Sequence, residues 1–518
     1  LGITPVDPLR HHLLFERFLS EGTTTMPDID IDFAADRREE VIQYVYQRYG
    51  KEHVGMVCNV VTYRARLALR EAAKAMAFPP DMIDRAAKAL DTHSTAQAAE
   101  ELDRLWSGES RPTGSPLQPD ALVPSLPWRT LVELLGEMEG VPRHLSIHVG
   151  GLLITAAPLV EVVPLERAAL PGRVVVQWDK DSIEDAGLIK IDLLGLRTLG
   201  MIDEALAHIQ EQRGIALDVD HLPLDDPAIY DLLRRTDTIG CFQVESRAQA
   251  QMLPRLQPHC FEDLIVEVAL VRPGPIQGGM VHPYLRRRQG LEPVTYAHPT
   301  LEPALAETLG VIVFQEQVIR VAMAIAGFSP AEADRLRRAM SRSRSDEAMG
   351  ALRERFLAGA RVNGIDAATA EEVYRQLAAF AGYGFCKSHA AAFALVAYQT
   401  LYLKAHFPAE FTCALLNHQP MGFYAPAVLV GDARRHGVEV LGPDINRSQV
   451  KCTLERKGPA LAVRLGLRYV HGLGEVWQSR IVERRGDRPF RSLADFCRRT
   501  RLPRPVIENL IRAGVLDG

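Results

Sequence analysis

The chain has 518 residues, of which 47% are hydrophobic and 24% are charged, and its net charge is −5. This length is too great for one hydrophobic core, so about three or four domains are expected in a soluble globular protein. The sequence has no run of about 18 apolar residues and no signal peptide at its start, which argues against membrane insertion and secretion. Its seven cysteines are scattered and never spaced CxxC, which favours reduced thiols in the cytoplasm over structural zinc.

The first informative stretch runs from Met26 to Phe33, where acidic and apolar residues alternate. This period of two predicts a strand with Asp28, Asp30 and Asp32 on one face and apolar side chains on the other. Carboxylates two residues apart lie about 6.5–7 Å apart by Cα, close enough to bind ions between them. Because such a row repels itself without a cation, it predicts a site for divalent metal.

Two other interpretations compete at this point. Asp28, Asp30 and Asp32 also stand at positions 1, 3 and 5 of a calcium loop with Glu39 at position 12, but Phe33 replaces the glycine that such a loop needs. A strand with a solvated acidic face is the second alternative.

Two helices are predicted next, over 37–49 and 63–76. The second contains Arg64, Arg66 and Arg70, which either contact phosphates or are simply solvated. A linker rich in Pro, Gly and Ser follows over 107–127.

Residues 144–155 predict a hairpin that turns at Gly150 and Gly151. We interpret His144 and His148 as structural or DNA-facing, since no thiol or carboxylate is adjacent to them in sequence. The stretch 174–196 then predicts a second acidic strand, in which Lys190 and Asp192 share one face.

Residues 197–440 are mostly helical by periodicity, including an arginine-rich helix over 331–344. A long helix is predicted to begin near Lys387, Ser388 and His389 and to end at His406. Its N-terminal end is either an anion site or an ordinary helix start.

The C-terminal part contains two similar units. Residues 470–474 precede a helix over 475–484, and residues 501–504 precede a helix over 505–513. This pattern resembles a tandem helix-hairpin-helix module, whose turns contact DNA phosphates without reading the base sequence. The candidate DNA-binding residues are Gly472, Gly474, Arg498, Arg499 and Arg504.

Three carboxylates from two strands are suited to hold two Mg²⁺ ions about 3.5–4 Å apart for phosphoryl transfer. The triphosphate then needs cations, for which Lys190, Arg337 and Arg338 are candidates, with Lys387 and His389 at the helix start.

Successive motifs of the chain closely resemble those of the bacterial C-family DNA polymerases, the family of the polymerase III alpha subunit. They are MPDIDIDF, GLIKIDLLGLRTL, FQVESR, VALVRPGP, VIVFQEQV, RLRRAMS, FAGYGFCKSHAAAFALVAYQTLYLKAHFPAEF and LGPDIN. The resemblance implies an α+β, multidomain protein with a polymerase-β-like nucleotidyltransferase palm. The implied domains are the palm (1–62 and 140–196), a helical thumb (63–139), large, mostly helical fingers (197–440) and a tandem helix-hairpin-helix DNA-binding domain (441–518).

The resemblance also implies roles. Asp30, Asp32 and Asp192 are similar to the catalytic, metal-binding carboxylates of the family. Lys190 resembles the palm lysine near the triphosphate, and Arg337 and Arg338 resemble the fingers arginines. The implied cofactor is two Mg²⁺ ions, and the implied substrates are primer-template DNA and dNTPs.

Residues 415–446 resemble the error-prone, damage-induced paralogue more than the replicative subunit. That likeness implies translesion synthesis in the DNA damage response, beside a sliding clamp and mutagenesis accessory proteins. Family members carry a PHP domain and a Gly-Ser phosphate-binding motif before the point where this sequence starts, and an OB-fold after its end. We therefore expect this portion to be weakly active or inactive alone. A replicative polymerase and a non-catalytic DNA-binding fragment are the alternatives.

Overall fold

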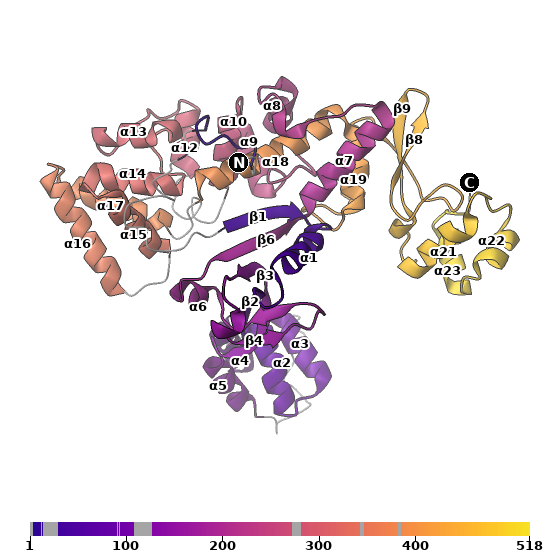
Figure 1. Cartoon of the computed structure of the whole chain (residues 1–518), viewed down its shortest axis with the longest axis horizontal. Helices are drawn as coiled ribbons and strands as arrows, with labels where there is room; N and C mark the ends of the chain where they lie inside the picture. The colour runs from indigo at the N-terminus through magenta and orange to yellow at the C-terminus, as the bar shows by residue number, and fades with distance from the viewer. Residues whose placement is uncertain are drawn as a thin grey trace. The chain divides into compact units, whose positions relative to one another are not determined.

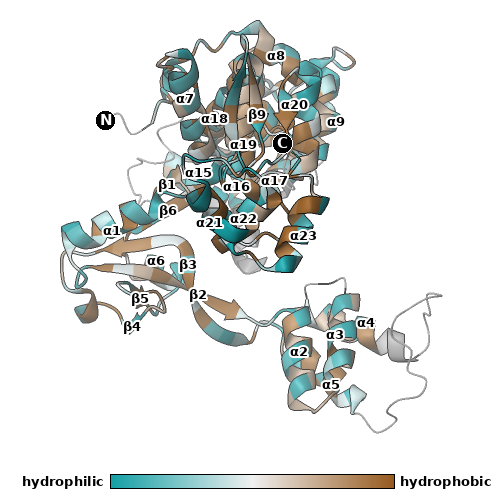
Figure 2. Ribbon diagram, turned by 90° about the vertical axis from the view of Figure 1, so that its right-hand side faces the viewer, coloured by the Kyte–Doolittle hydropathy of each residue, from teal (hydrophilic) through white to brown (hydrophobic). Residues whose placement is uncertain are grey.

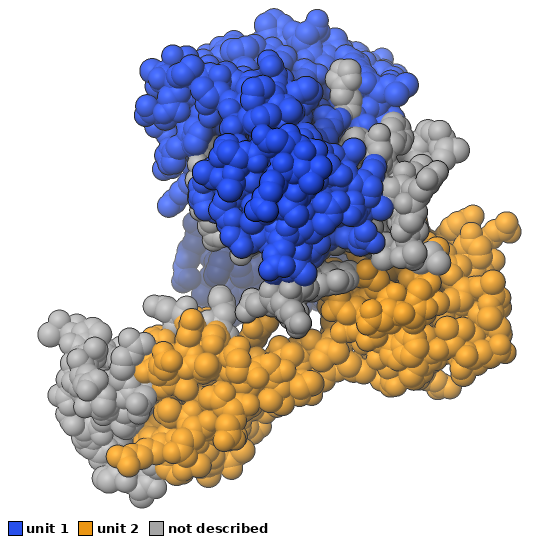
Figure 3. All heavy atoms as spheres, turned by 90° about the vertical axis from the view of Figure 1, so that its left-hand side faces the viewer, with its two compact units in different colours: residues 1–24, 34–36, 196–518 blue, residues 25–33, 37–195 orange. Residues whose placement is uncertain are grey.

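The computed structural model describes residues 4–11, 13, 29–90, 92, 94–107, 127–271, 281–341, 346–381 and 385–517. Asp28 and nearly all of the predicted linker over 107–127 lie outside these residues. The chain forms two compact units, coloured separately in Figure 3. Unit 1 comprises residues 1–24, 34–36 and 196–518, and unit 2 comprises residues 25–33 and 37–195. The palm, thumb and fingers boundaries stay predictions.

Unit 2 contains a six-stranded sheet in the order β1-β6-β3-β2-β5-β4. Its strands are β1 (Ile29–Ala34), β2 (Val54–Thr62), β3 (Pro142–Ile154), β4 (Leu165–Arg167), β5 (Val174–Val176) and β6 (Lys190–Leu196). Strands far apart in sequence are therefore neighbours, and Figure 1 shows β1 and β6 side by side next to α1 (Arg38–Tyr49). Both predicted acidic strands are present as adjacent strands.

Helix α1 covers one face of this sheet, and α6 (Lys180–Asp185) packs on the other, where Ile183 is buried with Val57 and Leu153. Ile42 and Tyr46 of α1 are buried with Met56 of β2, Leu152 of β3 and Leu193 of β6. This packing confirms the predicted amphipathic helix over 37–49, since its apolar positions face the sheet.

The predicted hairpin at Gly150 and Gly151 is wrong, because both residues lie inside the continuous strand β3. These glycines serve close packing. A Cβ on Gly150 would lie 2.7 Å from Leu194 Cδ2, and one on Gly151 would lie 2.9 Å from both His148 Nδ1 and Val57 Cβ. Gly-Gly therefore marks a close approach of neighbouring groups to β3.

A small helical bundle completes unit 2. It consists of α2 (Ala65–Ala75), α3 (Pro80–Ala89), α4 (Thr95–Ser107) and α5 (Trp128–Glu137). Its core is rich in alanine and leucine, and Figure 2 shows β2 and β3 running from the sheet toward the bundle. The predicted helix over 63–76 is confirmed as α2.

Unit 1 is mostly helical between residues 197 and 435, as predicted. Its helices in this range are α7 (Arg197–Arg213), α8 (Pro227–Arg234), α9 (Arg247–Leu256), α10 (Phe261–Leu270), α12 (Val281–Arg288), α13 (Glu302–Leu305), α14 (Gln315–Ala326), α15 (Pro330–Ser341), α16 (Asp346–Val362), α17 (Ala367–Ala381), α18 (Lys387–His406), α19 (Pro408–Asn417) and α20 (Pro426–Arg435). Helix α18 is the predicted long helix, and many of its residues lie in one large core. In the described part of the chain, no helix has both the length and the apolar character needed to span a membrane.

The C-terminal part of unit 1 begins with a three-stranded sheet in the order β7-β9-β8. Its strands are β7 (Glu439–Leu441), β8 (Thr453–Lys457) and β9 (Ala460–Arg464), and they precede α21 (Glu475–Arg485), α22 (Leu493–Thr500) and α23 (Arg504–Arg512). The helices enclose their own core around Ile481, Phe496 and Leu510. The two predicted turn-helix units are α21 and α23 with their preceding turns.

A buried lysine links the helices of unit 1. Lys404 of α18 is 3% exposed. Its ammonium donates to Ile239 O at 3.0 Å and Asp432 Oδ2 at 2.9 Å, and it lies 3.2 Å from Asp237 Oδ1. Helix α18, α20 and the 237–239 turn therefore meet at this one cation, and its loss removes the buried partner that Asp237 and Asp432 share.

We expect Lys404→Met to lower the free energy of unfolding of unit 1 by about 3–5 kcal/mol, the usual effect of removing one partner from a buried ion pair. Lys457→Met is the matched control, since that lysine is about half exposed and pairs with Glu439 at the surface. Scanning calorimetry of the unit 1 transition measures both variants. Equal, small effects would contradict the structural role of Lys404.

A second buried ionisable side chain, that of Glu267, has no hydrogen-bond partner among the described residues. Glu267 of α10 is fully buried, and its carboxyl oxygens make no hydrogen bond to any described residue. Burial raises the pKa of this carboxyl well above its ordinary value. The folded chain therefore holds a proton here that the unfolded chain releases, so folding stability falls as the pH rises from the ordinary pKa through the raised one.

Replacing Glu267 with leucine removes this penalty. We expect Glu267→Leu to stabilise unit 1 by about 1–3 kcal/mol at pH 8 and to flatten the dependence of its stability on pH above about 5. Glu211→Leu, at an exposed position of α7, is the control and is expected to change stability by less than about 0.5 kcal/mol. Denaturation of both variants at about pH 5 and about pH 8 checks the sign. Destabilisation by Glu267→Leu at pH 8 would contradict it.

Candidate active site

The predicted catalytic aspartates lie on adjacent strands of the unit 2 sheet. Asp30 and Asp32 are on β1 and Asp192 is on β6, its neighbour in the sheet. Asp30 is exposed, Asp32 is half-buried and Asp192 is buried. Burial raises the pKa of the Asp32 carboxyl. Neighbouring strands lie about 4.7–4.9 Å apart, so the topology brings the acidic positions into one region of the sheet.

Lys190 pairs directly with Asp192. Its Nζ donates to Asp192 Oδ2 at 2.7 Å, and the two side chains are 14% and 10% exposed. This contact confirms that the two residues share one face of β6. It also means that the cation predicted for the triphosphate is bound to a predicted metal ligand.

The other oxygen of Asp192 is buried and makes no hydrogen bond. His148 on β3 lies beside this oxygen, with its Nδ1 3.5 Å from Asp192 Oδ1. That nitrogen accepts hydrogen bonds from the backbone N–H groups of Gly151 at 2.7 Å and Gly150 at 3.3 Å, so its lone pair is occupied and it has no proton to donate. Asp192 Oδ1 thus keeps its lone pairs available to a cation.

His148 is the site neighbour that the sequence did not assign. The sequence predicts a structural or DNA-facing histidine, and the structure places His148 beside Asp192, whereas His144 is exposed near the other end of β3. The antiparallel register explains the contact, because Gly151 pairs with Asp192. Only the strand pairing, which no local pattern encodes, could have revealed it.

Arg38 of α1 anchors β6 in this position. Its Nε donates to Leu193 O at 2.5 Å, and the same guanidinium donates to Val149 O of β3. One side chain therefore holds α1 against β6, the strand that contains Asp192, and against its neighbour β3, a role that no local sequence pattern predicts.

The carboxylates of Asp30, Asp32 and Asp192 do not lie as close together as the ligands of one metal ion do. In the described part of the chain, one group of three potential ligands has all its atoms within 4.8 Å, and it is Asp237, Asp432 and His436 of unit 1. That group surrounds the ammonium of Lys404 and so already has its cation. Asp30, Asp32 and Asp192 do not meet this distance, and Asp192 has Lys190 as its partner.

The donor chemistry of the unit 2 site nevertheless fits divalent metal. Asp30, Asp32 and Asp192 supply only carboxylate oxygens, which are the ligands that Mg²⁺ prefers. The buried, unbonded Oδ1 of Asp192 is a free coordination position.

The predicted nucleotide-binding residues of unit 1 have carboxylate partners. Arg337 of α15 is 13% exposed and pairs with Asp334 at 2.8 Å, and the side chain of Arg338 lies outside the described residues. Lys387 Nζ donates to Glu307 Oε2 at 2.6 Å. The backbone N–H of Lys387 donates to Glu316, so a carboxylate holds the helix start where an anion was predicted.

His389 lies two positions after Lys387, in the first turn of α18. Its ring lies 4.8 Å from the ring of Phe385 and 4.0 Å from that of Phe393. The nucleotide roles of Lys387 and His389 stay predictions, and an incoming phosphate has to replace the glutamates at this helix start.

The arginines of α2 differ in their surroundings. Arg64 is exposed, Arg66 donates to Leu90 O at 2.9 Å, and Arg70 pairs with Asp84 at 2.5 Å. Arg66 thus ties α2 to the end of α3. Among these three predicted phosphate contacts, Arg66 and Arg70 have partners inside the bundle.

The predicted DNA-binding residues of the helix-hairpin-helix part also differ in their surroundings. Gly472 has a φ of +77°, which the turn before α21 requires, and Gly474 is the N-cap of α21. Arg498 and Arg504 are 78% and 90% exposed.

Arg499 departs from its predicted role in DNA binding. Its guanidinium lies 4.4 Å from the ring centroid of Phe490 and donates to Arg485 O at 3.0 Å and Arg488 O at 2.9 Å. It is 14% exposed and also pairs with Asp495. Because its donors are engaged inside the domain, Arg499 is a structural residue here.

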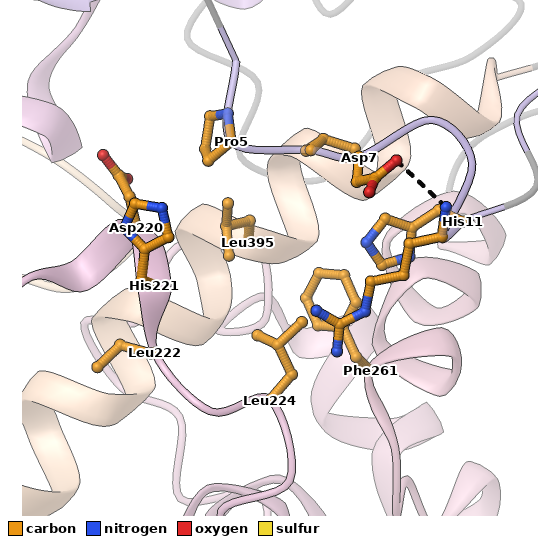
Figure 4. Close-up of a pocket in the computed structure, with 11 residues that line it drawn as sticks. Pro5, Asp7, His11, Asp220, His221, Leu222, Leu224, Phe261 and Leu395 are labelled. Carbon is orange, nitrogen blue, oxygen red and sulfur yellow. Dashed lines mark hydrogen bonds between the residues drawn. The ribbon is translucent and has the colours of Figure 1, made fainter. Parts of the chain in front are cut away.

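A separate pocket of about 210 Å³ lies in unit 1 (Figure 4). Asp7 and His11 of the N-terminal segment line it together with Phe261 of α10 and Leu395 of α18. It contains none of the predicted site residues and does not bear on the acidic strands.

Three family models match the chain. The bacterial DNA polymerase III alpha NTPase domain matches residues 1–195, the finger domain of the bacterial DNA polymerase III alpha subunit matches residues 198–364, and a helix-hairpin-helix motif matches residues 437–518. These models follow one another along nearly the whole sequence.

Curated relatives agree with the family models. The chain is 49% identical to an error-prone DNA polymerase of Anaeromyxobacter dehalogenans, over 100% of the chain and 46% of the relative. It is 47% identical to proteins of the same name from Methylococcus capsulatus and Mycobacterium bovis, over 100% of the chain and 50% and 45% of the relatives. The chain spans about half the length of the curated relatives that it matches. We conclude that it belongs to the bacterial DNA polymerase III alpha subunit family.

Proposed function

We propose that the chain is the core portion of a DNA-directed DNA polymerase, a nucleotidyltransferase that adds dNTPs to a primer 3′-hydroxyl on a DNA template. The observation that carries this proposal is the acidic region formed by β1 and β6, in which buried Asp192 keeps one oxygen without a hydrogen bond. Family membership supports it.

The reaction would use the side chains of β1 and β6. Asp30, Asp32 and Asp192 would hold two Mg²⁺ ions, which when bound supply activation of the hydroxyl and stabilisation of the leaving pyrophosphate. Arg38 and the strand register keep Asp192 in place for this task. Burial raises the pKa of the Asp32 carboxyl, and a cation bound nearby would act in the opposite direction.

The triphosphate would be bound by Lys190, Arg337 and Arg338, with Lys387 and His389 at the start of α18. In the absence of nucleotide, Lys190, Arg337 and Lys387 pair with carboxylates of the chain itself. Binding is therefore an exchange, in which phosphate oxygens replace Asp192, Asp334 and Glu307 as the anionic partners.

Primer-template DNA would be held through its phosphates. The exposed arginines Arg64, Arg498 and Arg504 and the turn at Gly472 and Gly474 are the contacts that we propose. Such contacts do not depend on base sequence, as a polymerase requires.

We further propose that the whole protein works in error-prone translesion synthesis during the DNA damage response. The relatives named error-prone DNA polymerase support this subtype. A sliding clamp and mutagenesis accessory proteins are the proposed partners, and the cytoplasm is the proposed location.

Replacing the catalytic aspartates tests the central assignment. In the full-length protein that contains this chain, we expect Asp30→Asn and Asp192→Asn each to lower the rate of Mg²⁺-dependent primer extension by at least about 100-fold, because even residues behind metal ligands typically matter 10–100-fold. Asp185→Asn changes an exposed aspartate of unit 2 and is expected to leave the rate unchanged.

Two alternative functions predict other results. A non-catalytic DNA-binding protein would bind primer-template but show the same extension rate, at background, with and without the aspartates. A replicative polymerase would extend undamaged templates with high fidelity and stop at an abasic site, whereas the error-prone enzyme extends past the lesion and misincorporates more often.

Salt dependence tests the phosphate contacts. Affinity for duplex DNA is expected to fall steeply between about 50 and 200 mM salt for every base sequence, and Arg504→Ala should reduce the slope of log affinity against log salt by about 1. Arg375→Ala is the control, since that arginine is exposed on α17 and outside the proposed interface. Fluorescence anisotropy with two unrelated duplexes measures the slope, and a slope that Arg504→Ala leaves unchanged would exclude this contact.

A further inference from the structure

Lys190 is bound to the same carboxylate that the proposed function assigns to metal. Its Nζ lies 2.7 Å from Asp192 Oδ2 in a region where both side chains are nearly buried. An ammonium and a metal ion are both cations, and both need the lone pairs of this oxygen. The Lys190 ammonium and a metal ion therefore cannot occupy the same position at Asp192 Oδ2.

Among the described residues, it is Lys190 that donates a hydrogen bond to the Asp192 carboxylate. The second oxygen receives none, and His148 faces it with an occupied lone pair instead of a proton. A buried carboxylate without a counter-charge is costly, and Lys190 supplies that counter-charge to Asp192.

We propose that Lys190 is a displaceable counter-ion of the metal site. It holds the Asp192 carboxylate in position before metal binds, it competes with the first metal ion for Oδ2, and it is released when that ion binds. This inference rests on the proposed function, because it requires Asp192 to be a metal ligand.

Release of Lys190 has a consequence for nucleotide binding. The ammonium stays on the acidic face of β6, since Lys190 and Asp192 are two residues apart on the same face. A phosphate group then becomes its alternative partner. Metal and nucleotide therefore bind with positive coupling, because each favours the state in which the Lys190–Asp192 pair is open.

Binding of Mn²⁺ to the full 518-residue chain without nucleotide tests this proposal. The free Mn²⁺ signal in electron paramagnetic resonance reports the dissociation constant, and Asp192→Asn defines the background from other sites. We expect Lys190→Met to tighten the Asp192-dependent site by about ten-fold, because one opposite charge at this distance shifts cation binding to a carboxylate by at least that factor. Lys190→Arg, which keeps the charge, is expected to bind Mn²⁺ about as the unmodified chain does.

Lys180→Met is the matched control. Lys180 is an exposed lysine of α6 in the same unit, so this variant removes one positive charge without opening a carboxylate. We expect no change in Mn²⁺ affinity. Equal tightening by Lys180→Met and Lys190→Met would show a general charge effect and overturn the specific role of Lys190.

A second measurement needs no variant and does not depend on whether Lys190→Met folds. Amine acetylation followed by mass spectrometry reports how accessible each lysine is. We expect Mn²⁺ to increase the labelling rate of Lys190 several-fold while the rate at Lys180 stays constant. An unchanged rate at Lys190, at Mn²⁺ concentrations that saturate the Asp192-dependent site, would overturn the proposal.

The outcomes separate this inference from the proposed function. If Asp192→Asn leaves Mn²⁺ binding unchanged, Asp192 is not a metal ligand and both proposals fail. If Asp192→Asn weakens Mn²⁺ binding but Lys190→Met does not tighten it, the metal site stands and the counter-ion role alone is wrong.

Discussion

Strand β6 lies between β1 and β3, and the candidate site depends on this pairing. Asp192 is opposite Gly151, where the absence of a Cβ lets the His148 ring and Val57 pack close to the strand. Arg38 of α1 donates hydrogen bonds to the backbone of β6 and of β3. A larger residue at position 151 would push these groups apart, so backbone packing determines where the Asp192 carboxylate lies.

A second feature of the molecule is that cations predicted to bind ligands are paired with its own carboxylates. Lys190, Arg337 and Lys387, which are predicted to meet a triphosphate, each have a carboxylate partner, and Arg499 is held inside its own domain. A chain of net charge −5 therefore has its own carboxylates beside the cations at these positions. Under the proposed function, ligand binding would be an exchange of partners, in which phosphate or metal replaces the internal ion.

Two buried ionisable residues of unit 1 show how a counter-charge changes the cost of burial. Lys404 is surrounded by Asp237 and Asp432 and so holds three segments together. Glu267 is buried on α10 without a partner, and its raised pKa is the physical sign of that cost. The same kind of burial is stabilising with a counter-charge and destabilising without one.

The sequence alone determined the acidic strands, the helical composition of residues 197–435 and the family, because alternation, helical periodicity and ordered motifs are local properties of the chain. It also placed Lys190 and Asp192 on one face, which follows from the period of two in a strand. The tertiary structure decided what those residues touch. The hairpin predicted at Gly150 and Gly151 became a continuous strand, and His148 came to lie beside Asp192 through strand pairing. Arg499, predicted to bind DNA, became a structural residue through its contact with Phe490. These contacts join residues distant in sequence or depend on local packing, so no local pattern could predict them.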